Sequence, residues 1–168
     1  IVDVGNESSV DTLFLASAKI GHVSLVINNA GLGVFSKIEE STVEDWDAQI
    51  NINLRGSFLV SRRYIPAMQK QKMGTLVFMN SVAGNFGYPY SAGYVASKFG
   101  LRGLSDSLRN ELRKDNIKVI SVHPGAIDTS FWDNISVDFN REEMLSPEMI
   151  ADSVVHAIEA PGAMVIED

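Results

Sequence analysis

GTLVFMNSVAG, residues 74–84, joins a run of consecutive apolar residues, Leu76 to Met79, to a group of small and polar residues. Successive side chains of a strand point to opposite faces of its sheet, so an unbroken apolar run predicts a strand that is buried on both faces. Strands of this kind are typical of parallel sheets covered by helices. The residues after Met79 favour a turn, which places a polar loop at the carboxyl end of this strand.

The same alternation extends over the whole chain. Apolar runs of strand length recur at 1–4, 23–28, 118–124 and 163–168, and helical periodicity lies between them at 8–19, 41–71, 91–116 and 146–162. Ser41 and Glu44 are spaced as a capping box, and Ser146 with Pro147 predicts another helix start. The pattern predicts one α/β domain over 1–168, a Rossmann-like doubly wound parallel sheet in three α/β/α layers.

Composition excludes several classes of protein. No stretch approaches the roughly 18 apolar residues that a membrane-spanning helix needs, so we expect no membrane span. The net charge of −7 argues against a nucleic-acid partner. Cysteine is absent, which excludes disulfides and thiolate metal sites and favours a reducing, cytoplasmic location. Three histidines lack the spacing of metal ligands, so no metal site is predicted.

Polar, turn-forming residues follow three of the predicted strands. They are NNAG at 28–31, NSVAG at 80–84 and HPGAIDT at 123–129. Ligands of open α/β sheets bind at the carboxyl ends of the strands. Small residues there let the backbone approach a flat ligand closely.

YVASK, residues 94–98, places the phenol of Tyr94 and the ammonium of Lys98 on one face of a predicted helix. Alone, this pair is indistinguishable from an ordinary exposed helical pair. A nearby cation favours the phenolate, however, and lowers the pKa of a phenol. Lys98 is therefore predicted to lower the pKa of Tyr94.

Taken together, these motifs resemble those of the short-chain dehydrogenase/reductase family. The match runs from Asp3 through NNAG, NLRG at 53–56, Ser81, YVASK and PGAIDT, and the interval of 13 residues from Ser81 to Tyr94 is the one that the family uses. The resemblance implies a Rossmann fold and an enzyme that transfers a hydride between a nicotinamide cofactor, NAD or NADP, and a carbonyl or alcohol substrate.

The resemblance also assigns roles to single residues. It implies that Tyr94 is the general acid/base and that Ser81 orients the substrate oxygen. Lys98 would tune Tyr94 and bind the nicotinamide ribose, and Asn53 would bind a water in a proton relay. The cofactor-binding residues that it implies are Asp3, Val4, Asn28, Ala30, Gly31, Tyr94, Lys98, Pro124, Gly125, Ile127 and Thr129. Asn28 is equally compatible with a structural role that bonds adjacent strands.

The substrate pocket is predicted to be mostly aromatic, which favours a hydrophobic or planar carbonyl compound. Its expected residues are Val82, Asn85, Phe86, Tyr88, Phe131 and Trp132. The last two belong to an irregular stretch, 125–145, of the length that binding loops have.

One family element has no counterpart in the sequence. The glycine-rich turn that binds the cofactor pyrophosphate should precede Asp3. We expect roughly 50–60 residues in front of Ile1, on the basis of the size of a βαβ unit, and an incomplete last strand. The preference between NAD and NADP depends on that part of the fold.

Other interpretations remain open from the residues. A non-catalytic cofactor-binding or regulatory protein could keep this fold. A Ser-His-Asp hydrolase is disfavoured because no G-x-S-x-G motif occurs. The helices at 42–71 and 91–115 carry apolar residues on more than one face, so we expect a homodimer or homotetramer.

Overall fold

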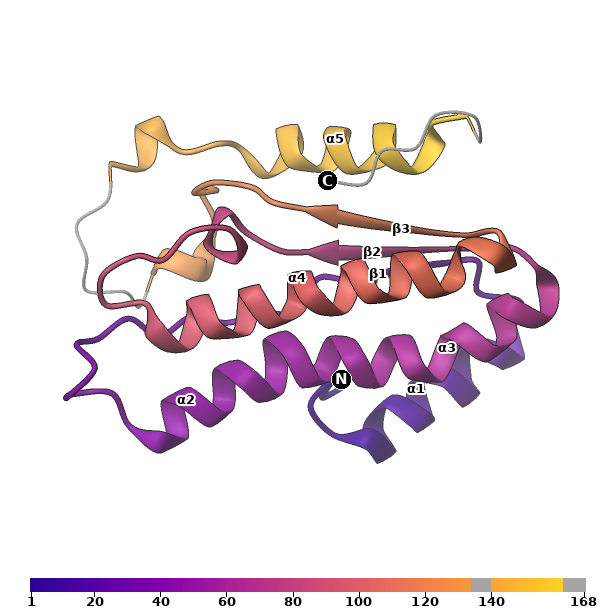
Figure 1. Ribbon diagram of the computed structural model, residues 1–168, viewed down its shortest axis with the longest axis horizontal. Coiled ribbons are helices and arrows are strands. Elements are labelled where there is room, and N and C mark those ends of the chain that lie inside the picture. The colour runs from indigo at the N-terminus through magenta and orange to yellow at the C-terminus, as the bar shows by residue number, and fades with distance from the viewer. Residues whose placement is uncertain (134–139, 162–168) are drawn as a thin grey trace.

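The centre of the fold is a three-stranded parallel sheet in the order β1-β2-β3. The computed structural model describes residues 1–133 and 140–161. The strands are β1 (Leu25–Asn28), β2 (Gly74–Met79) and β3 (Ile117–Val122). Leu76 is the Cα partner of both Val26 and Val119, which defines the register across the sheet. All three strands point the same way (Figure 1), so their carboxyl ends share one edge of the sheet.

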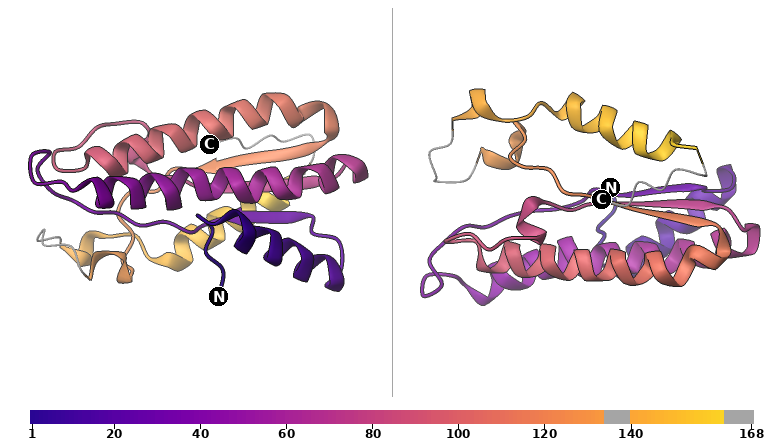
Figure 2. Two further views of the ribbon diagram at one scale, coloured as in Figure 1. Left: turned by 90° about the horizontal axis from the view of Figure 1, so that it is seen from below. Right: turned by 45° about the horizontal axis from the view of Figure 1, so that its top comes forward.

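Helices cover both faces of the sheet. Figure 1 shows α3 (Ser57–Gln71) and α4 (Ala92–Leu112) on one side and α5 (Pro147–Glu159) on the other. The turned views of Figure 2 keep α5 separate from that helical layer. The helix α1 (Glu7–Ile20) packs along α3. The predicted α/β/α arrangement around a parallel sheet is confirmed.

Two apolar clusters lie on opposite faces of the strands. Leu76 and Phe78 of β2 belong to the larger cluster, which α1, α3 and α4 complete. Val77 belongs to the smaller one, together with Val154 and Ala157 of α5. Alternate residues of β2 enter different clusters, so this strand has no polar face and reads as an unbroken apolar run.

The long helical segment in front of β2 is built from three pieces. These are α2 (Val43–Gln49), the π-helix η1 (Ile50–Gly56) and α3. Thr42, rather than Ser41, caps the segment, and its hydroxyl accepts a 3.0 Å hydrogen bond from the backbone of Asp45. The prediction of Ser41 with Glu44 was therefore wrong by one residue, because the turn Thr42 to Asp45 supplies an equivalent hydroxyl and acid.

The remaining helices end close to their predicted bounds. Asn6 caps α1, and Gly21 follows its last turn. α4 continues into the short 3-10 helix η3 (Arg113–Asp115), after which Asn116 has a φ of 57°. Ser146 caps α5, as predicted, and its hydroxyl accepts from the backbone of Met149. Three further 3-10 turns are η2 (Val82–Gly84), η4 (Ser130–Trp132) and η5 (Arg141–Glu143).

The strand predicted at 1–4 is not present. The residues before α1 form no ladder with β1, β2 or β3, and a strand exists only where a neighbour pairs with its backbone groups. The strand predicted at 163–168 lies outside the described residues, as does Phe139. Within the described part of the chain, no helix combines the length and apolarity that a membrane crossing requires.

Candidate active site

The site forms where the three strands end. The loop after β1 passes so close to α4 and η1 that a Cβ on Gly31 would lie 3.4 Å from Oδ1 of Asn53 and 3.9 Å from Nζ of Lys98. The loop after β2 begins with Asn80 and Ser81, and Val82 donates a 3.0 Å hydrogen bond to the carbonyl of Pro124 in the loop after β3. The parallel sheet thus brings the predicted strand-end motifs to one edge.

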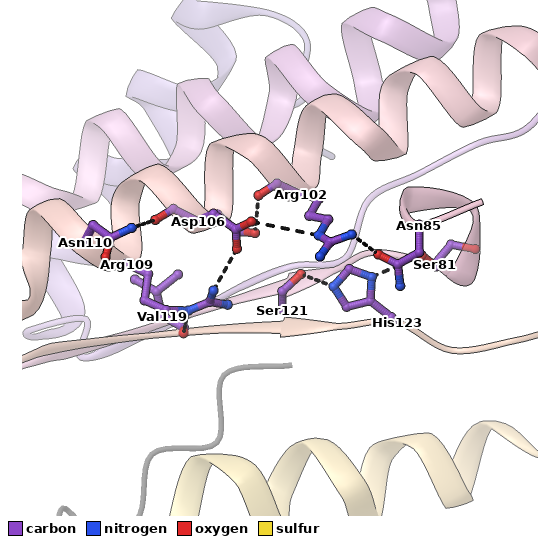
Figure 3. Close-up of polar contacts among 10 residues, drawn as sticks. Ser81, Asn85, Arg102, Asp106, Arg109, Asn110, Val119, Ser121 and His123 are labelled. Atoms are coloured by element: carbon purple, nitrogen blue, oxygen red, sulfur yellow. Dashed lines mark hydrogen bonds and ion pairs between the residues drawn. The ribbon is translucent and has the colours of Figure 1, made fainter. Parts of the chain in front are cut away.

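Ser81 stands at the start of η2. Its hydroxyl oxygen accepts a 3.1 Å hydrogen bond from the backbone of Ala83, which caps the turn. Its own backbone N–H donates to Oδ1 of Asn80 at 3.0 Å, and its carbonyl lies 3.2 Å from Nδ1 of His123 (Figure 3). Backbone and side chain of Ser81 are therefore held from several directions.

Tyr94 and Lys98 lie one turn apart on α4, as predicted from their spacing. Burial raises the pKa of the Tyr94 phenol above its usual range, and a hydrogen bond with Ser81 partly opposes that rise. Burial lowers the pKa of the Lys98 ammonium to about 8. The ammonium lies 5.6 Å from the centre of the Tyr94 ring and donates a 2.8 Å hydrogen bond to the carbonyl of Met79.

The net shift of the Tyr94 pKa is opposite to the one predicted from sequence. Lys98 was expected to lower it, but loss of hydration has the larger effect, and the Lys98 ammonium is directed at the Met79 carbonyl. The phenol is therefore protonated at neutral pH in this structure.

Asn53 lies in the middle of the π-helix and is 1% exposed. Its side-chain amide exchanges two hydrogen bonds of 2.8 Å with the backbone of Leu32 and donates a third, of 2.9 Å, to the hydroxyl of Ser97. Ser97 in turn donates to the carbonyl of Tyr94 at 2.7 Å. Asn53 therefore connects the loop after β1 to the helix that carries Tyr94.

Only some of the residues predicted to bind the adenosine end of a cofactor lie around the same cavity. Val4, Asn28 and Ala30 line one cavity beside β1. Asp3 accepts a 2.9 Å hydrogen bond from the backbone of Gly5 in the turn before α1 and does not line that cavity. The amide of Asn28 donates a 3.3 Å hydrogen bond to Ser61 of α3, which is a structural contact between strand and helix.

The loop after β3 folds back on itself. Ile127 pairs with Leu145 in an isolated bridge, and its carbonyl accepts a 2.8 Å hydrogen bond from the indole of Trp132. The Thr129 hydroxyl caps η4 by accepting from the backbone of Phe131. Gly125 is exposed, and a Cβ there would meet no atom within 4 Å. This loop delivers Phe131 and Trp132 to the site.

The ring of Phe131 lies beside the ring of Tyr94. Its ring centre is 5.9 Å from that of Tyr94 and 5.2 Å from that of Trp132. Val82 begins η2 beside Ser81. Phe86 and Tyr88 are 63% and 47% exposed, and neither joins these ring contacts among the described residues. Of the predicted aromatic wall, the structure assembles only the half contributed by the loop after β3.

Phe35 completes that wall and was missed from the sequence. Its ring centre is 5.6 Å from that of Tyr94 and 6.2 Å from that of Trp132, on which it stacks with an interplanar angle of 20°. Gly33 makes room for this packing, since a Cβ there would lie 2.6 Å from Phe131. The available signal was position alone, because Phe35 follows the NNAG turn by only a few residues.

Comparisons with known proteins agree with this geometry. A family model described as short chain dehydrogenase matches residues 1–139. A sepiapterin reductase from Chlorobaculum tepidum is 37% identical over 150 residues, covering 89% of this chain and 61% of that protein. An uncharacterised oxidoreductase of Staphylococcus epidermidis is 32% identical over 167 residues, covering 99% of this chain and 72% of that protein.

Solved structures resemble the fold closely. An alcohol dehydrogenase from the archaeon Thermococcus sibiricus, complexed with 5-hydroxy-NADP, superposes with a TM-score of 0.89 at 26% identity. The match covers 99% of this chain and 70% of that one. A gluconate 5-dehydrogenase from Burkholderia cenocepacia, at 20% identity and a TM-score of 0.85, shares the fold over 92% of this chain and 65% of that one.

The chain spans 61% of the sepiapterin reductase that it matches, so the comparison concerns a part of that protein's length. Within this part, the parallel sheet, the strand-end loops and the family match over residues 1–139 all agree. The chain belongs to the short-chain dehydrogenase family.

Proposed function

We propose that the protein is an NAD(P)-dependent oxidoreductase that transfers a hydride between a nicotinamide cofactor and a carbonyl or alcohol substrate. The observation that carries this proposal is the contact of Tyr94 with Ser81, with the buried ammonium of Lys98 one helical turn away. A phenol and a hydroxyl in contact can bind and protonate a carbonyl oxygen on which negative charge develops, and a cation nearby stabilises that charge.

The residues around Lys98 fit a nicotinamide cofactor. Lys98 is 5% exposed, and its ammonium has three donors, of which one is used by the Met79 carbonyl among the described residues. A buried ammonium with free donors suits the hydroxyl groups of a ribose. Gly31 leaves open the space beside Lys98 that a side chain would occupy. The alcohol dehydrogenase relative holds an NADP derivative, which supports NADP or NAD as the cofactor here.

The nicotinamide, when bound, supplies or accepts the hydride. Ser81 donates a hydrogen bond to the substrate oxygen and holds it beside Tyr94. Tyr94 provides the proton as negative charge develops on that oxygen. With its pKa above the usual range, the Tyr94 phenol carries its proton at neutral pH and has one to donate in carbonyl reduction. Lys98 stays largely charged below pH 8 and stabilises the phenolate that proton transfer leaves behind.

The substrate is proposed to be a planar or hydrophobic carbonyl compound. Phe35, Phe131 and Trp132 form an apolar aromatic wall beside Tyr94. Offset and edge-to-face contacts with such rings stabilise a flat ligand beyond the effect of area alone. The sepiapterin reductase relative, whose name denotes an enzyme acting on a pterin, is consistent with this class.

The protein is further proposed to act in the cytoplasm as a homodimer or homotetramer. The absence of cysteine favours a reducing compartment. Large apolar side chains are exposed on the helical layer, among them Trp46 on α2, Phe58 on α3 and Phe99 on α4. Exposed apolar side chains of this size suit a contact between subunits.

The test is Tyr94→Phe in the full-length protein, assayed by cofactor oxidation against a panel of planar and aliphatic ketones. We expect turnover to fall by at least about a thousandfold, within the range for loss of proton transfer. Cofactor binding, followed by fluorescence, should stay largely intact. Tyr90→Phe is the matched control, because Tyr90 is 58% exposed and its ring is not among the aromatic contacts of Tyr94 in the described part of the chain.

Two outcomes would overturn the proposal. A fully active Tyr94→Phe variant would remove the proton donor from the mechanism. An unsubstituted protein that binds the cofactor but turns over no substrate in the panel would favour the alternative, a non-catalytic cofactor-binding or regulatory protein of the same fold.

A further inference from the structure

A side chain from the end of β3 reaches the main chain of Ser81. The Ser81 carbonyl accepts one hydrogen bond, of 2.8 Å, from the backbone of Gly84 within its own turn. It lies 3.2 Å from Nδ1 of His123, which follows β3 directly (Figure 3). A carbonyl oxygen has two lone pairs and accommodates both donors. His123 therefore connects the end of β3 to the main chain of Ser81, the residue proposed to orient the substrate oxygen.

The other ring nitrogen of His123 is also engaged. Nε2 lies 2.8 Å from the hydroxyl of Ser121, a β3 residue with no exposed surface. Because the Ser81 carbonyl can only accept, Nδ1 must carry a proton to bond it. In the neutral ring, Nε2 then accepts from the Ser121 hydroxyl. The two contacts together select one tautomer and one ring orientation.

Backbone hydrogen bonds join the loop after β2 to the end of β3 on either side of Ser81. Asn80 donates to the carbonyl of Val122 at 2.8 Å, and Val82 donates to the carbonyl of Pro124 at 3.0 Å, so the ladder from β2 continues past Ser81. Pro124 has no N–H and cannot donate back to the β2 side. The Ser81 carbonyl lies between these two backbone bonds, and the side chain of His123 reaches it there.

The segment from Asn80 to Asn85 is also attached at its second end, by a contact that does not involve His123. Asn85, just after η2, accepts a 2.6 Å hydrogen bond from the guanidinium of Arg102 on α4 (Figure 3). The backbone bonds of Asn80 and Val82 do not involve the imidazole. Loss of the His123 side chain would therefore leave the segment attached at both ends and affect Ser81 locally.

We propose that His123 is a positioning residue for the reaction, which holds Ser81 through its carbonyl and thereby sets the direction in which the Ser81 hydroxyl meets the substrate oxygen. The inference rests on the proposed function, since Ser81 has a substrate to orient only if the protein turns one over. His123 itself touches neither Tyr94 nor Lys98 in the contacts described above.

Two substitutions separate this role from general packing. In His123→Asn, the amide nitrogen takes the place of Nδ1 and still reaches Ser81. In His123→Gln, the amide nitrogen takes the place of Nε2, so the bond toward Ser121 is kept and the one to Ser81 is lost. His156→Gln on the exposed face of α5 is the matched control. All variants are made in the full-length protein and assayed by steady-state kinetics.

We expect His123→Gln to lower kcat by roughly threefold to tenfold, the effect of one hydrogen bond, with the KM for the cofactor unchanged. His123→Asn should recover most of that loss, and His156→Gln should match the unsubstituted protein. Both position-123 variants should fold, because the Ser81 carbonyl keeps its bond from Gly84. Equal kcat for the Gln variant and the unsubstituted protein would overturn the inference, as would equal losses for Gln and Asn.

A second measurement does not depend on turnover. A long-range proton–nitrogen correlation spectrum of the unsubstituted protein should place the His123 proton on Nδ1, and a proton on Nε2 alone would overturn the inference. An unsubstituted protein without activity would overturn the proposed function and this role with it. An active protein with an equally active Gln variant would overturn this role alone.

Discussion

Asn53 and Leu32 exchange two hydrogen bonds of 2.8 Å, so that one side-chain amide satisfies both backbone groups of a residue in the loop after β1. Asn53 belongs to a π-helix, a rare geometry that is found frequently at functional sites. Ser57 donates a 3.0 Å hydrogen bond to the carbonyl of Asn53, which supports the backbone there. This pair ties the loop beside Lys98 to the long helical segment.

Asn53→Ala is expected to destabilise the protein by about 2–4 kcal/mol, because the N–H and C=O of Leu32 lose their partner in a partly buried site. Urea denaturation measures the change. Asn110→Ala is the control, since Asn110 is exposed and, among the described residues, its side chain bonds the carbonyl of Asp106 in its own helix. Its effect should stay within about 0.5 kcal/mol. Comparable effects of the two substitutions would contradict a bridging role for Asn53.

Lys98→Met is expected to stabilise the protein while it abolishes turnover. The pKa of Lys98 is lowered from 10.5 to about 8, so burial of the charged form has a cost of about 3 kcal/mol below pH 8. Between pH 8 and 10.5 the unfolded chain binds more protons than the folded one, so this cost decreases as pH rises. The variant should therefore be more stable by about 1–3 kcal/mol at pH 7, with the difference vanishing above pH 10.5.

Denaturant unfolding from pH 6 to 11 measures the free energy of unfolding of the unsubstituted protein and of Lys98→Met. The difference between them isolates Lys98, because every other titrating group is shared. A variant that is less stable at pH 7 would show that the Lys98 bond to the Met79 carbonyl outweighs the loss of hydration.

Phe35→Ala is expected to raise the KM for aromatic carbonyl substrates by roughly fivefold to twentyfold, because the substitution removes the ring that stacks on Trp132 beside Tyr94. Small aliphatic ketones, which contact little of this wall, should show a much smaller change. Steady-state kinetics on a matched pair of ketones checks this. An equal increase in KM for both ketones would show that Phe35 supports the packing of the site and does not select the substrate.

Phe99→Glu is expected to convert the proposed oligomer to monomers. Phe99 is 45% exposed on α4, and a carboxylate in a buried subunit contact would lose its hydration without a partner. Multi-angle light scattering measures the mass. Leu15→Glu on α1, with a side chain 57% exposed, is a control away from the α4 face. A monomeric unsubstituted protein would remove the basis for the expectation.

The strand at 74–79 could be recognised from sequence because both of its faces are apolar. The one at 117–122 could be recognised because β-branched apolar residues dominate both faces, although Lys118 and Ser121 interrupt them. The strand predicted at 1–4 was wrong, since an apolar run forms a strand only beside a partner. The helix start at 41 was wrong by one residue, because Ser41 and Thr42 offer equivalent hydroxyl groups. The π-helix has no signal in the periodicity of 41–71.

Local chemistry and spacing determined much of this protein. Apolar runs and helix caps indicated the α/β fold, and the interval from Ser81 to Tyr94 with Lys98 one turn later supported the family resemblance from which the catalytic roles are proposed. The tertiary structure decided what depends on contacts between distant segments. It partly buried Tyr94 so that the phenol pKa rises, placed Phe35 against Trp132, and joined His123 to Ser81. Hydration, ring packing and hydrogen bonds across strands depend on neighbours that residue spacing does not specify.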